Sequence, residues 1–186
     1  MNQPYELGRD CIVWSVDGVA PMKVISTPVK KPGRKLMHWQ YITLNYDIPG
    51  AVALAVNNGR IAIAKEWRLP IRSYALEIPR GRGREGETTA ATAARELAEE
   101  TGLEASAVKE LGHLYPDSGT LSAPIGVAVI SVKDDKGTGH TDGEICDWFW
   151  VSENDLDQMM AEGRFNDGIS MAALQLWRAQ GSPVPE

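Results

Sequence analysis

The alternation of apolar and polar residues predicts a chain of short β-strands with helices between them. The clearest pattern spans residues 51–63, where Val and Leu occupy every second position of 52–56 before the turn 57–59, and the alternation resumes after it. A period of two on both sides of Asn-Asn-Gly predicts a β-hairpin. The other predicted strands are residues 11–16, 37–44, 74–79, 125–132 and 147–151.

Local start and stop signals place a first helix at residues 89–101. Thr88 is a candidate N-cap, and Gly102 supplies the stop. Its apolar positions predict one buried face made of Ala91, Ala94, Leu97 and Ala98. We therefore expect the acidic side chains of this helix to project from the side opposite a buried face.

Two more helices are predicted near the C-terminus. Ser152 with Asp155 resembles a capping box for a helix that runs to about Ala161. Residues 167–180 form an amphipathic helix with an apolar face made of Ile169, Ala172, Ala173, Leu176 and Trp177. Helices placed between and after strands predict an α+β fold in which helices are layered around a mixed sheet.

The first 46 residues differ from the rest because they contain strand signals and turns only. Pro49-Gly50 follows them, and the strong hairpin pattern then begins. We predict a small N-terminal antiparallel β subdomain at residues 1–46 and a main domain at residues 47–186.

Composition narrows the possible functions. The 186-residue chain carries a net charge of -6, which argues against binding of a nucleic acid duplex. Cys11 and Cys146 are far apart and outside any metal-ligand spacing, so we expect buried free thiols. No run approaches the roughly 18 apolar residues of a membrane span. The N-terminus lacks a leader pattern, so we expect a cytoplasmic protein with no membrane partner.

The chemistry-bearing residues concentrate in the predicted helix at residues 89–101. Glu96, Glu99 and Glu100 occupy positions i, i+3 and i+4, where carboxylates are neighbours and repel one another. A hard divalent cation relieves this repulsion, and oxygen ligands without nearby His or Cys favour Mg²⁺ or Mn²⁺ over zinc. The alternative is a solvated acidic helix whose spacing has no function.

Residues 81–103 also follow a known pattern: Gly, five residues, Glu, seven residues, then Arg-Glu-apolar-any-Glu-Glu-any-Gly-apolar. The segment resembles the Nudix box at every constrained position, namely Gly81, Glu87, Arg95, Glu96, Leu97, Glu99, Glu100, Gly102 and Leu103. The resemblance implies a Nudix-like α/β/α sandwich. It also implies that the β-rich N-terminal segment takes part in a homodimer, as in relatives that act on ADP-ribose and similar sugar nucleotides.

The resemblance further implies roles for individual residues. Glu96 and Glu100 correspond to the main metal ligands of the family, Glu99 contributes to the metal site, and the backbone carbonyl of Arg80 is a further ligand. On physical grounds, Arg95 can pair with Glu99 four residues later and orient it. We expect Glu87 and Gly81 to fix the turn that leads into the helix.

Segments that flank the box resemble those of ADP-ribose pyrophosphatases and their sugar-nucleotide relatives. Trp67 is a candidate for stacking on a base, or alternatively a core residue, and Arg68 is a candidate phosphate ligand. Three arginines close together in sequence, Arg80, Arg82 and Arg84, either bind phosphate, which would favour a longer phosphate chain or another sugar nucleotide, or belong to a solvated loop. Residues 115–119 resemble the family's loop after the box, but with a shifted proline, which weakens the assignment of ADP-ribose itself.

The general base is expected on the loop before the last strand, by the same resemblance. Glu144 is the first candidate and Asp142 the second, because a loop carboxylate can accept a proton from an attacking water. His113 and His140 lack triad-like companions, so we expect them to be structural or surface residues.

The leading hypothesis is an Mg²⁺-dependent enzyme that binds a small-molecule nucleotide and splits the diphosphate of ADP-ribose or a related nucleoside diphosphate-sugar. Two alternatives stay open: hydrolysis of dinucleoside polyphosphates or nucleotides, and a Nudix ligand-binding domain without catalysis.

Overall fold

The structure is a computed structural model that describes residues 4–137 and 145–186. The chain divides into two compact units. The first extends to Ile48 and includes Tyr115–Pro124, and the second contains Pro49–Leu114 and the chain from Ile125 onward. Residues 115–124 thus leave the second unit in the middle of its sequence and join the first.

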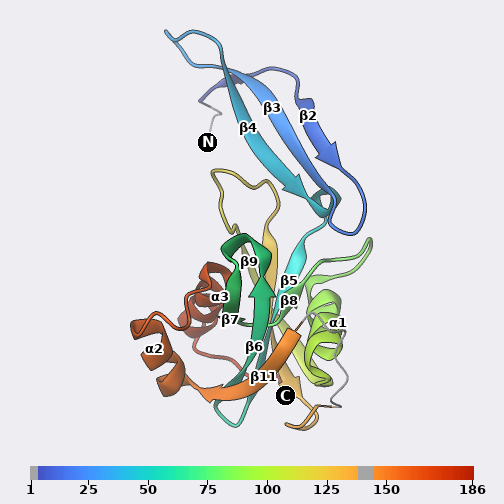
Figure 1. The fold of residues 1–186 in the computed structure, drawn as a ribbon, viewed down its shortest axis with the longest axis vertical. Helices are drawn as coiled ribbons and strands as arrows, with labels where there is room; N and C mark the ends of the chain where they lie inside the picture. Colours follow the sequence, from blue (N-terminus) through green and yellow to red (C-terminus); the bar gives the residue numbers. More distant parts are fainter. Residues whose placement is uncertain (1–3, 138–144) are drawn as a thin grey trace. The chain divides into compact units, whose positions relative to one another are not determined.

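The first unit is a four-stranded antiparallel sheet with its third strand at the centre (Figure 1). The predicted strands 11–16 and 37–44 are confirmed as β2 (Cys11–Val16) and β4 (Met37–Leu44). The central strand β3 (Met22–Lys30), which pairs with β1 (Glu6–Leu7), β2 and β4, was not predicted. It contains Pro28, a residue that usually marks an edge strand or a break. A short 3-10 turn, η1 (Asn45–Asp47), follows β4.

The second unit contains a seven-stranded mixed sheet with the core order β11-β6-β5-β10-β9. The predicted hairpin is confirmed as β5 (Gly50–Asn57) and β6 (Arg60–Arg68). β7 (Ser73–Glu77), preceded by the turn η2 (Leu69–Ile71), pairs with β6, and β8 (Arg80–Gly81) pairs with β5. β10 (Ile125–Val132) and β11 (Ile145–Ser152) confirm the last two predicted strands, whereas β9 (Ala105–Leu114) was not predicted.

In the described residues three helices cover this sheet, and the caps predicted for the first two are confirmed. α1 (Thr89–Thr101) begins after Thr88, whose hydroxyl accepts a hydrogen bond from the amide of Ala91 at 3.1 Å, and ends at Gly102 with φ 71°. α2 (Glu153–Ala161) is capped by Ser152, which accepts from the amide of Asp155 at 3.2 Å. α3 (Gly168–Ala179) is capped by Asp167.

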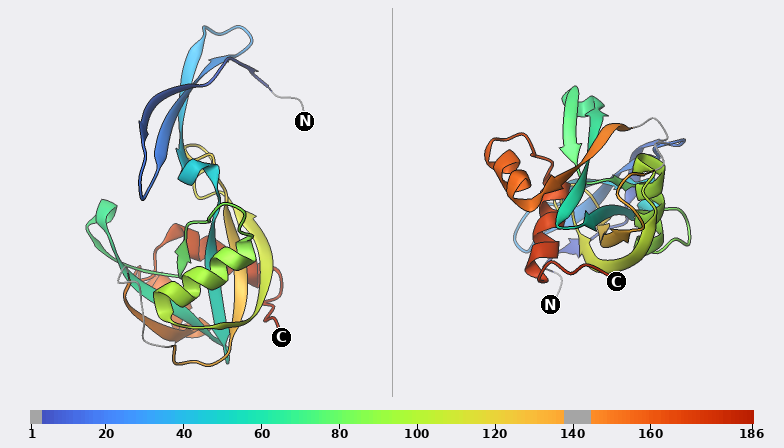
Figure 2. Two further views of the ribbon diagram at one scale, coloured as in Figure 1. Left: turned by 90° about the vertical axis from the view of Figure 1, so that its right-hand side faces the viewer. Right: turned by 90° about the horizontal axis from the view of Figure 1, so that it is seen from below.

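The helices lie on both faces of the sheet, which confirms the α/β/α sandwich (Figures 1 and 2). Val52, Leu54 and Val56 of β5 pack in one core with residues of α2 and α3, such as Leu156 and Trp177. The alternate residues of β5 are alanines that pack in a second core with Ala93 and Leu97 of α1. Small side chains on this face let the α1 backbone approach the sheet closely.

The buried faces of α1 and α3 differ from the predicted ones. On α1 the buried residues are Thr92, Ala93, Leu97, Glu100 and Thr101, whereas Ala91 and Ala98 are exposed. On α3, Leu174 is buried and Ala172 is exposed. Alanine is compatible with either side of a helix, so an alanine-rich sequence does not determine the face that packs. As a consequence, Glu100 lies on the buried side of α1 and does not project away from it.

The prediction of buried thiols is wrong for Cys11, which is free and exposed. It belongs to β2, a strand in which every residue is exposed, including Ile12, Val13 and Trp14. In the described part of the chain no helix is long and apolar enough to cross a membrane.

We predict that Ala93→Leu destabilises the protein by about 1–3 kcal/mol, because a larger side chain overpacks the closed space between α1 and the sheet. Ala91→Leu, the same change on the exposed side of the same helix, is expected to alter stability by less than about 0.5 kcal/mol. Urea unfolding followed by circular dichroism measures both. Equal effects of the two substitutions would show that the assigned face of α1 is wrong.

Candidate active site

One guanidinium organises the acidic surface of α1. Arg95 Nη1 donates to Glu96 Oε1 at 2.6 Å and to Glu99 Oε2 at 2.9 Å, so the expected ion pair with Glu99 is present. Its Nε donates to Glu87 Oε1 at 2.9 Å, and Nη2 donates to Glu87 Oε2 at 2.9 Å and to the backbone carbonyl of Arg82 at 2.8 Å. These contacts connect the helix to the loop that precedes it.

Glu87 holds the turn between that loop and the helix. Its Oε2 accepts hydrogen bonds from the amide of Arg84 at 3.0 Å and from the hydroxyl of Thr92 at 2.9 Å. Because the Arg95 guanidinium donates to both of its oxygens, the pKa of Glu87 falls to about 2. Glu87 therefore remains charged and keeps the loop against α1 at ordinary pH.

Gly81 provides the surface against which the Glu96 carboxylate packs. A Cβ atom at position 81 would overlap the Glu96 carboxylate itself, so any other residue at this position would force that carboxylate to move. Burial raises the pKa of Glu96, and the neighbouring Arg95 opposes this shift. Glu100 is 5% exposed and lies on the buried side of the same helix turn.

Glu96, Glu99 and Glu100 offer only carboxylate oxygens, which are the ligands that a hard divalent cation prefers. The Glu96 carboxylate also lies in a cradle that a Cβ at Gly81 would fill. As arranged in residues 4–137 and 145–186, no three acidic, His or Cys side chains surround a common point that would hold an ion. Arg95 Nη1 bridges Glu96 and Glu99 instead. A cation would thus exchange places with this guanidinium, which retains Glu87 as its partner.

A second charged cluster, absent from the sequence-based assignment, lies beside the N-terminus of α3. Arg80 binds Asp167 through both terminal nitrogens, at 2.6 and 3.2 Å, and its Nη2 lies 2.6 Å from Glu77 Oε2. Arg68 pairs with the other oxygen of Glu77 at 2.8 Å and with Glu66 at 2.8 Å. These residues are separated by up to about 100 positions, so no local sequence signal identifies the cluster.

The cluster alternates acidic and basic groups, and this shapes their ionisation. Burial alone would raise the pKa of Asp167, but Arg80 and Ser170 together lower it below its ordinary value. Burial raises the pKa of Glu66 to about 7, and a hydrogen bond with Glu77 adds to the effect.

Comparison with known proteins identifies the family. Residues 48–173 match the NUDIX domain. This chain belongs to the Nudix family.

Curated relatives include three proteins with different names. The Methanol dehydrogenase activator of Bacillus methanolicus is 29% identical over 136 residues, which are 71% of this chain and 74% of that protein. The ADP-ribose pyrophosphatase of Bacillus subtilis (strain 168) is 42% identical over 73 residues, or 38% and 40% of the two chains. The ADP-sugar pyrophosphatase of Mus musculus is 31% identical over 102 residues, or 52% and 47%. The two pyrophosphatases are thus matched over less than half of their lengths.

Among solved structures, one described as an ADP compounds hydrolase superposes with a TM-score of 0.77. The superposition covers 97% of this chain and 98% of that one at 17% sequence identity. At this identity the likeness establishes a shared fold and nothing further.

The flanking candidates of the Nudix box occupy different environments. Arg82 and Arg84 are exposed, and Arg84 Nη2 donates to Glu99 Oε1 at 3.0 Å. Trp67 is 48% exposed and packs edge to face against Tyr74 with ring centroids 5.1 Å apart, so it is not a core residue. Arg68 belongs to the cluster around Glu77, and the Arg80 side chain points to that cluster as well.

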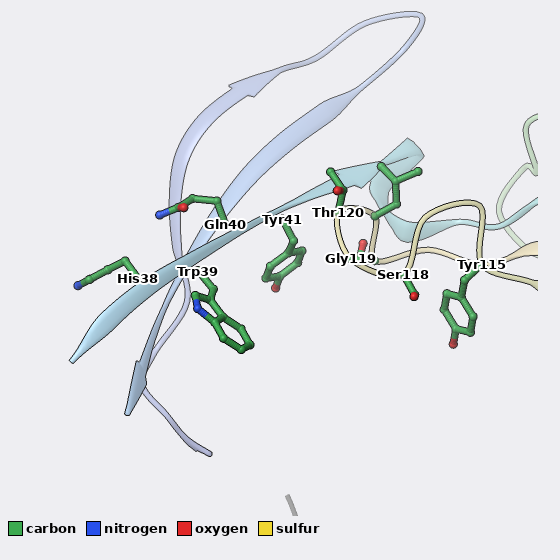
Figure 3. A pocket seen from close by; sticks show the side chains of 10 residues that line it. His38, Trp39, Gln40, Tyr41, Tyr115, Ser118, Gly119 and Thr120 are labelled. Atoms are coloured by element: carbon green, nitrogen blue, oxygen red, sulfur yellow. The ribbon is translucent and has the colours of Figure 1, made fainter. Parts of the chain in front are cut away.

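The remaining sequence candidates lie outside this unit or outside the described residues. Glu144, Asp142 and His140 are outside the described residues. Residues 115–119 belong to the first unit, where residues 115 and 118–122 line a cavity of about 730 Å³ with residues 38–41 of β4. Figure 3 shows the aromatic rings of Trp39, Tyr41 and Tyr115 together with the polar side chains around them.

We predict that Gly81→Ala weakens Mn²⁺ binding on the order of tenfold or more, because the new methyl group displaces the Glu96 carboxylate. Electron paramagnetic resonance of free Mn²⁺ measures the affinity. Gly168→Ala is the control, since a Cβ there meets no atom within 4 Å. If Gly81→Ala bound Mn²⁺ as tightly as the wild-type protein, the metal site would not require the Glu96 carboxylate to pack on Gly81.

Proposed function

We propose that this chain is an Mg²⁺-dependent Nudix hydrolase that acts on ADP-ribose or a related nucleoside diphosphate-sugar; Mn²⁺ is the alternative cation. The products are a nucleoside monophosphate and a sugar phosphate. The observation that carries the proposal is the arrangement of Glu96 and Glu99 around Arg95, with the Glu96 carboxylate against Gly81 and Glu100 one helix turn away. The names of two relatives, an ADP-ribose pyrophosphatase and an ADP-sugar pyrophosphatase, support the substrate class.

In this proposal each residue has a separate task. When bound, the cation supplies charge that neutralises the diphosphate oxygens and lowers the barrier to attack by water. Glu96, Glu99 and Glu100 hold it together with the backbone carbonyl of Arg80. Before the cation binds, Arg95 orients Glu96 and Glu99 through the contacts described above and offsets their mutual repulsion.

Further groups bind the substrate and move the proton. Arg82 and Arg84 are exposed beside the acidic face, where a guanidinium can bind phosphate oxygens. Trp67 is exposed enough to stack on a base, and Arg68 neighbours it on β6. Glu144 accepts the proton from the attacking water, with Asp142 as the second candidate.

A substrate panel tests the proposal. Purified protein with Mg²⁺ is incubated with ADP-ribose, other nucleoside diphosphate-sugars, dinucleoside polyphosphates and nucleoside triphosphates, and the products are separated by chromatography. We expect a nucleoside monophosphate and a sugar phosphate in equal amounts from the first two groups. Turnover confined to the other groups would favour the alternative hydrolase, and binding without turnover would favour a ligand-binding domain.

Glu100→Gln tests the metal ligands in the same assay, because it removes one ligand charge while keeping the side-chain shape. Loss of a preorganised charge at such a site costs on the order of a hundredfold in kcat or more. Its far-UV spectrum is expected to match wild type. Full activity of Glu100→Gln at ordinary Mg²⁺ would contradict the assignment of the metal ligands.

The same proposal includes a homodimer formed through the N-terminal sheet. Strand β2 leaves Ile12, Val13, Trp14 and Val16 at least 42% exposed. Neighbouring exposed apolar residues on a sheet strand are typical of a surface covered by another chain. A second copy of this chain is the partner that the family resemblance implies.

Light scattering after size exclusion tests the oligomeric state, with an expected mass of twice the chain mass of 20.3 kDa. Val13→Lys is expected to shift the protein toward the monomer, because it introduces a charge into the covered surface. Val184→Lys, at a residue 51% exposed in the second unit, is the control. A wild-type monomer at micromolar concentration would exclude this dimer.

A further inference from the structure

The partly buried cluster around Arg80 contacts the backbone that leads directly into the Nudix box. Three of its residues, Arg80, Asp167 and Ser170, are called the Arg80 clamp below. The side chains of Arg80 and Asp167 are only 14% and 16% exposed, and Ser170 is fully buried. The clamp joins the N-terminus of α3 to strand β8, across 87 residues of sequence.

The clamp is closed by hydrogen bonds at each of its members. Asp167 accepts from Arg80 Nη1 at 2.6 Å and Nη2 at 3.2 Å, a bidentate geometry that fixes the plane of the guanidinium. Asp167 also accepts from the hydroxyl of Ser170 at 2.6 Å and from its amide at 2.8 Å. Ser170 Oγ in turn accepts from the amide of Ile78 at 2.9 Å.

Residues 78–81 are therefore held from two directions. The α3 side holds the amide of Ile78 and the side chain of Arg80. On the sheet, the carbonyl of Pro79 accepts from the amide of Ala53 at 2.8 Å, and Arg80 and Gly81 pair with Val52 and Ala51 of β5. A pairing of only two residues is marginal by itself, so these further contacts help to order the strand.

Strand geometry connects the clamp to the acidic face of α1. Successive residues of a strand point to opposite faces, so the Arg80 side chain and the Cβ direction of Gly81 lie on opposite sides of β8. Arg80 reaches Asp167 of α3, whereas the Gly81 position meets the Glu96 carboxylate of α1. A shift of the backbone on one side thus moves the contact on the other.

We propose that Arg80 and Asp167 are positioning residues for the box carboxylates: their ion pair holds the β8 backbone where Gly81 receives the Glu96 carboxylate. The effect of this ion pair on metal binding and catalysis rests on the metal-dependent hydrolysis proposed above. The hold of the clamp on the β8 backbone is independent of that proposal. Asp167 contacts Arg80 and Ser170 and acts on the box through Arg80.

Stability alone does not require a charged pair at this place in the fold. Burial of an ion pair costs desolvation energy, and apolar residues of similar size often give equal or greater stability. A bidentate Arg–carboxylate pair differs from apolar packing in fixing direction, which is the property that a ligand-bearing turn requires.

The test uses Asp167→Asn and Arg80→Lys in the full-length protein. Asn remains a good N-cap, so α3 is expected to keep its start, while the charged bidentate pair is lost. Arg178→Lys is the matched control, because Arg178 is a partly buried arginine of α3 that pairs with Glu153 and Asp157 away from β8.

The first measurement is amide hydrogen exchange without metal, on peptides that contain residues 78–84. We expect exchange about tenfold faster in Asp167→Asn and Arg80→Lys and unchanged in Arg178→Lys, because only the first two release β8. The second measurement is Mn²⁺ affinity by electron paramagnetic resonance. Loss of a group that orients a metal ligand is expected to weaken it on the order of tenfold, and KM at saturating Mg²⁺ stays unchanged.

The two measurements separate the possible failures. Unchanged exchange at residues 78–84 in both variants overturns the clamp, and faster exchange with wild-type Mn²⁺ affinity overturns its link to the carboxylates. If Asp167→Asn does not fold, Arg80→Lys decides alone, since it keeps the charge. A wild-type protein that binds no Mn²⁺ contradicts the proposed function instead, and the exchange result still decides whether the clamp holds β8.

Discussion

The compensation of three carboxylates by the single guanidinium of Arg95 is the constraint on which the acidic face of α1 depends. Like charges on one helix surface repel, and partial burial strengthens the repulsion because it removes water that would screen it. Arg95 opposes this with hydrogen bonds to Glu87, Glu96 and Glu99. One of its donors also holds the carbonyl of Arg82, so the same charge that stabilises the helix orders the loop before it.

The parts of this arrangement that were predictable are those that local sequence determines. Thr88 and Gly102 define the ends of α1 because capping depends on residues within one turn of the helix. The pairing of Arg95 with Glu99 follows from a spacing of four residues. The prediction of which side of α1 packs on the sheet was wrong. Alanine is compatible with both sides of a helix, and only contact with the alanine face of β5 determines which side is buried.

Other features were missed because their local sequence is ambiguous or because their partners are distant in sequence. Strand β3 contains Pro28, which has no backbone N–H to donate and therefore argued against a central strand. In the folded chain the carbonyl of Pro28 still accepts a hydrogen bond from the amide of Gly8. Strand β9 carries Lys109, Glu110 and other polar residues that obscure a period of two. The Arg80 side chain was grouped with Arg82 and Arg84 because all three are close in sequence, whereas its partner Asp167 is known only once the chain is folded.

The neighbouring residues Arg80, Arg82 and Arg84 have different roles in the structure. Arg84 is 62% exposed, and solvent screening makes its pair with Glu99 weak, so it is free to change partners when a polyanion arrives. Arg80 is mostly buried and bound through both terminal nitrogens of its guanidinium, so exchanging its partners would leave Asp167 without a cationic partner and Glu77 with Arg68 alone. Arg82 contributes its backbone carbonyl to Arg95. A cluster that looks uniform as Arg-Gly-Arg-Gly-Arg is therefore divided by burial into a fixed anchor and exchangeable surface charge, and only the surface charge is suited to bind a substrate.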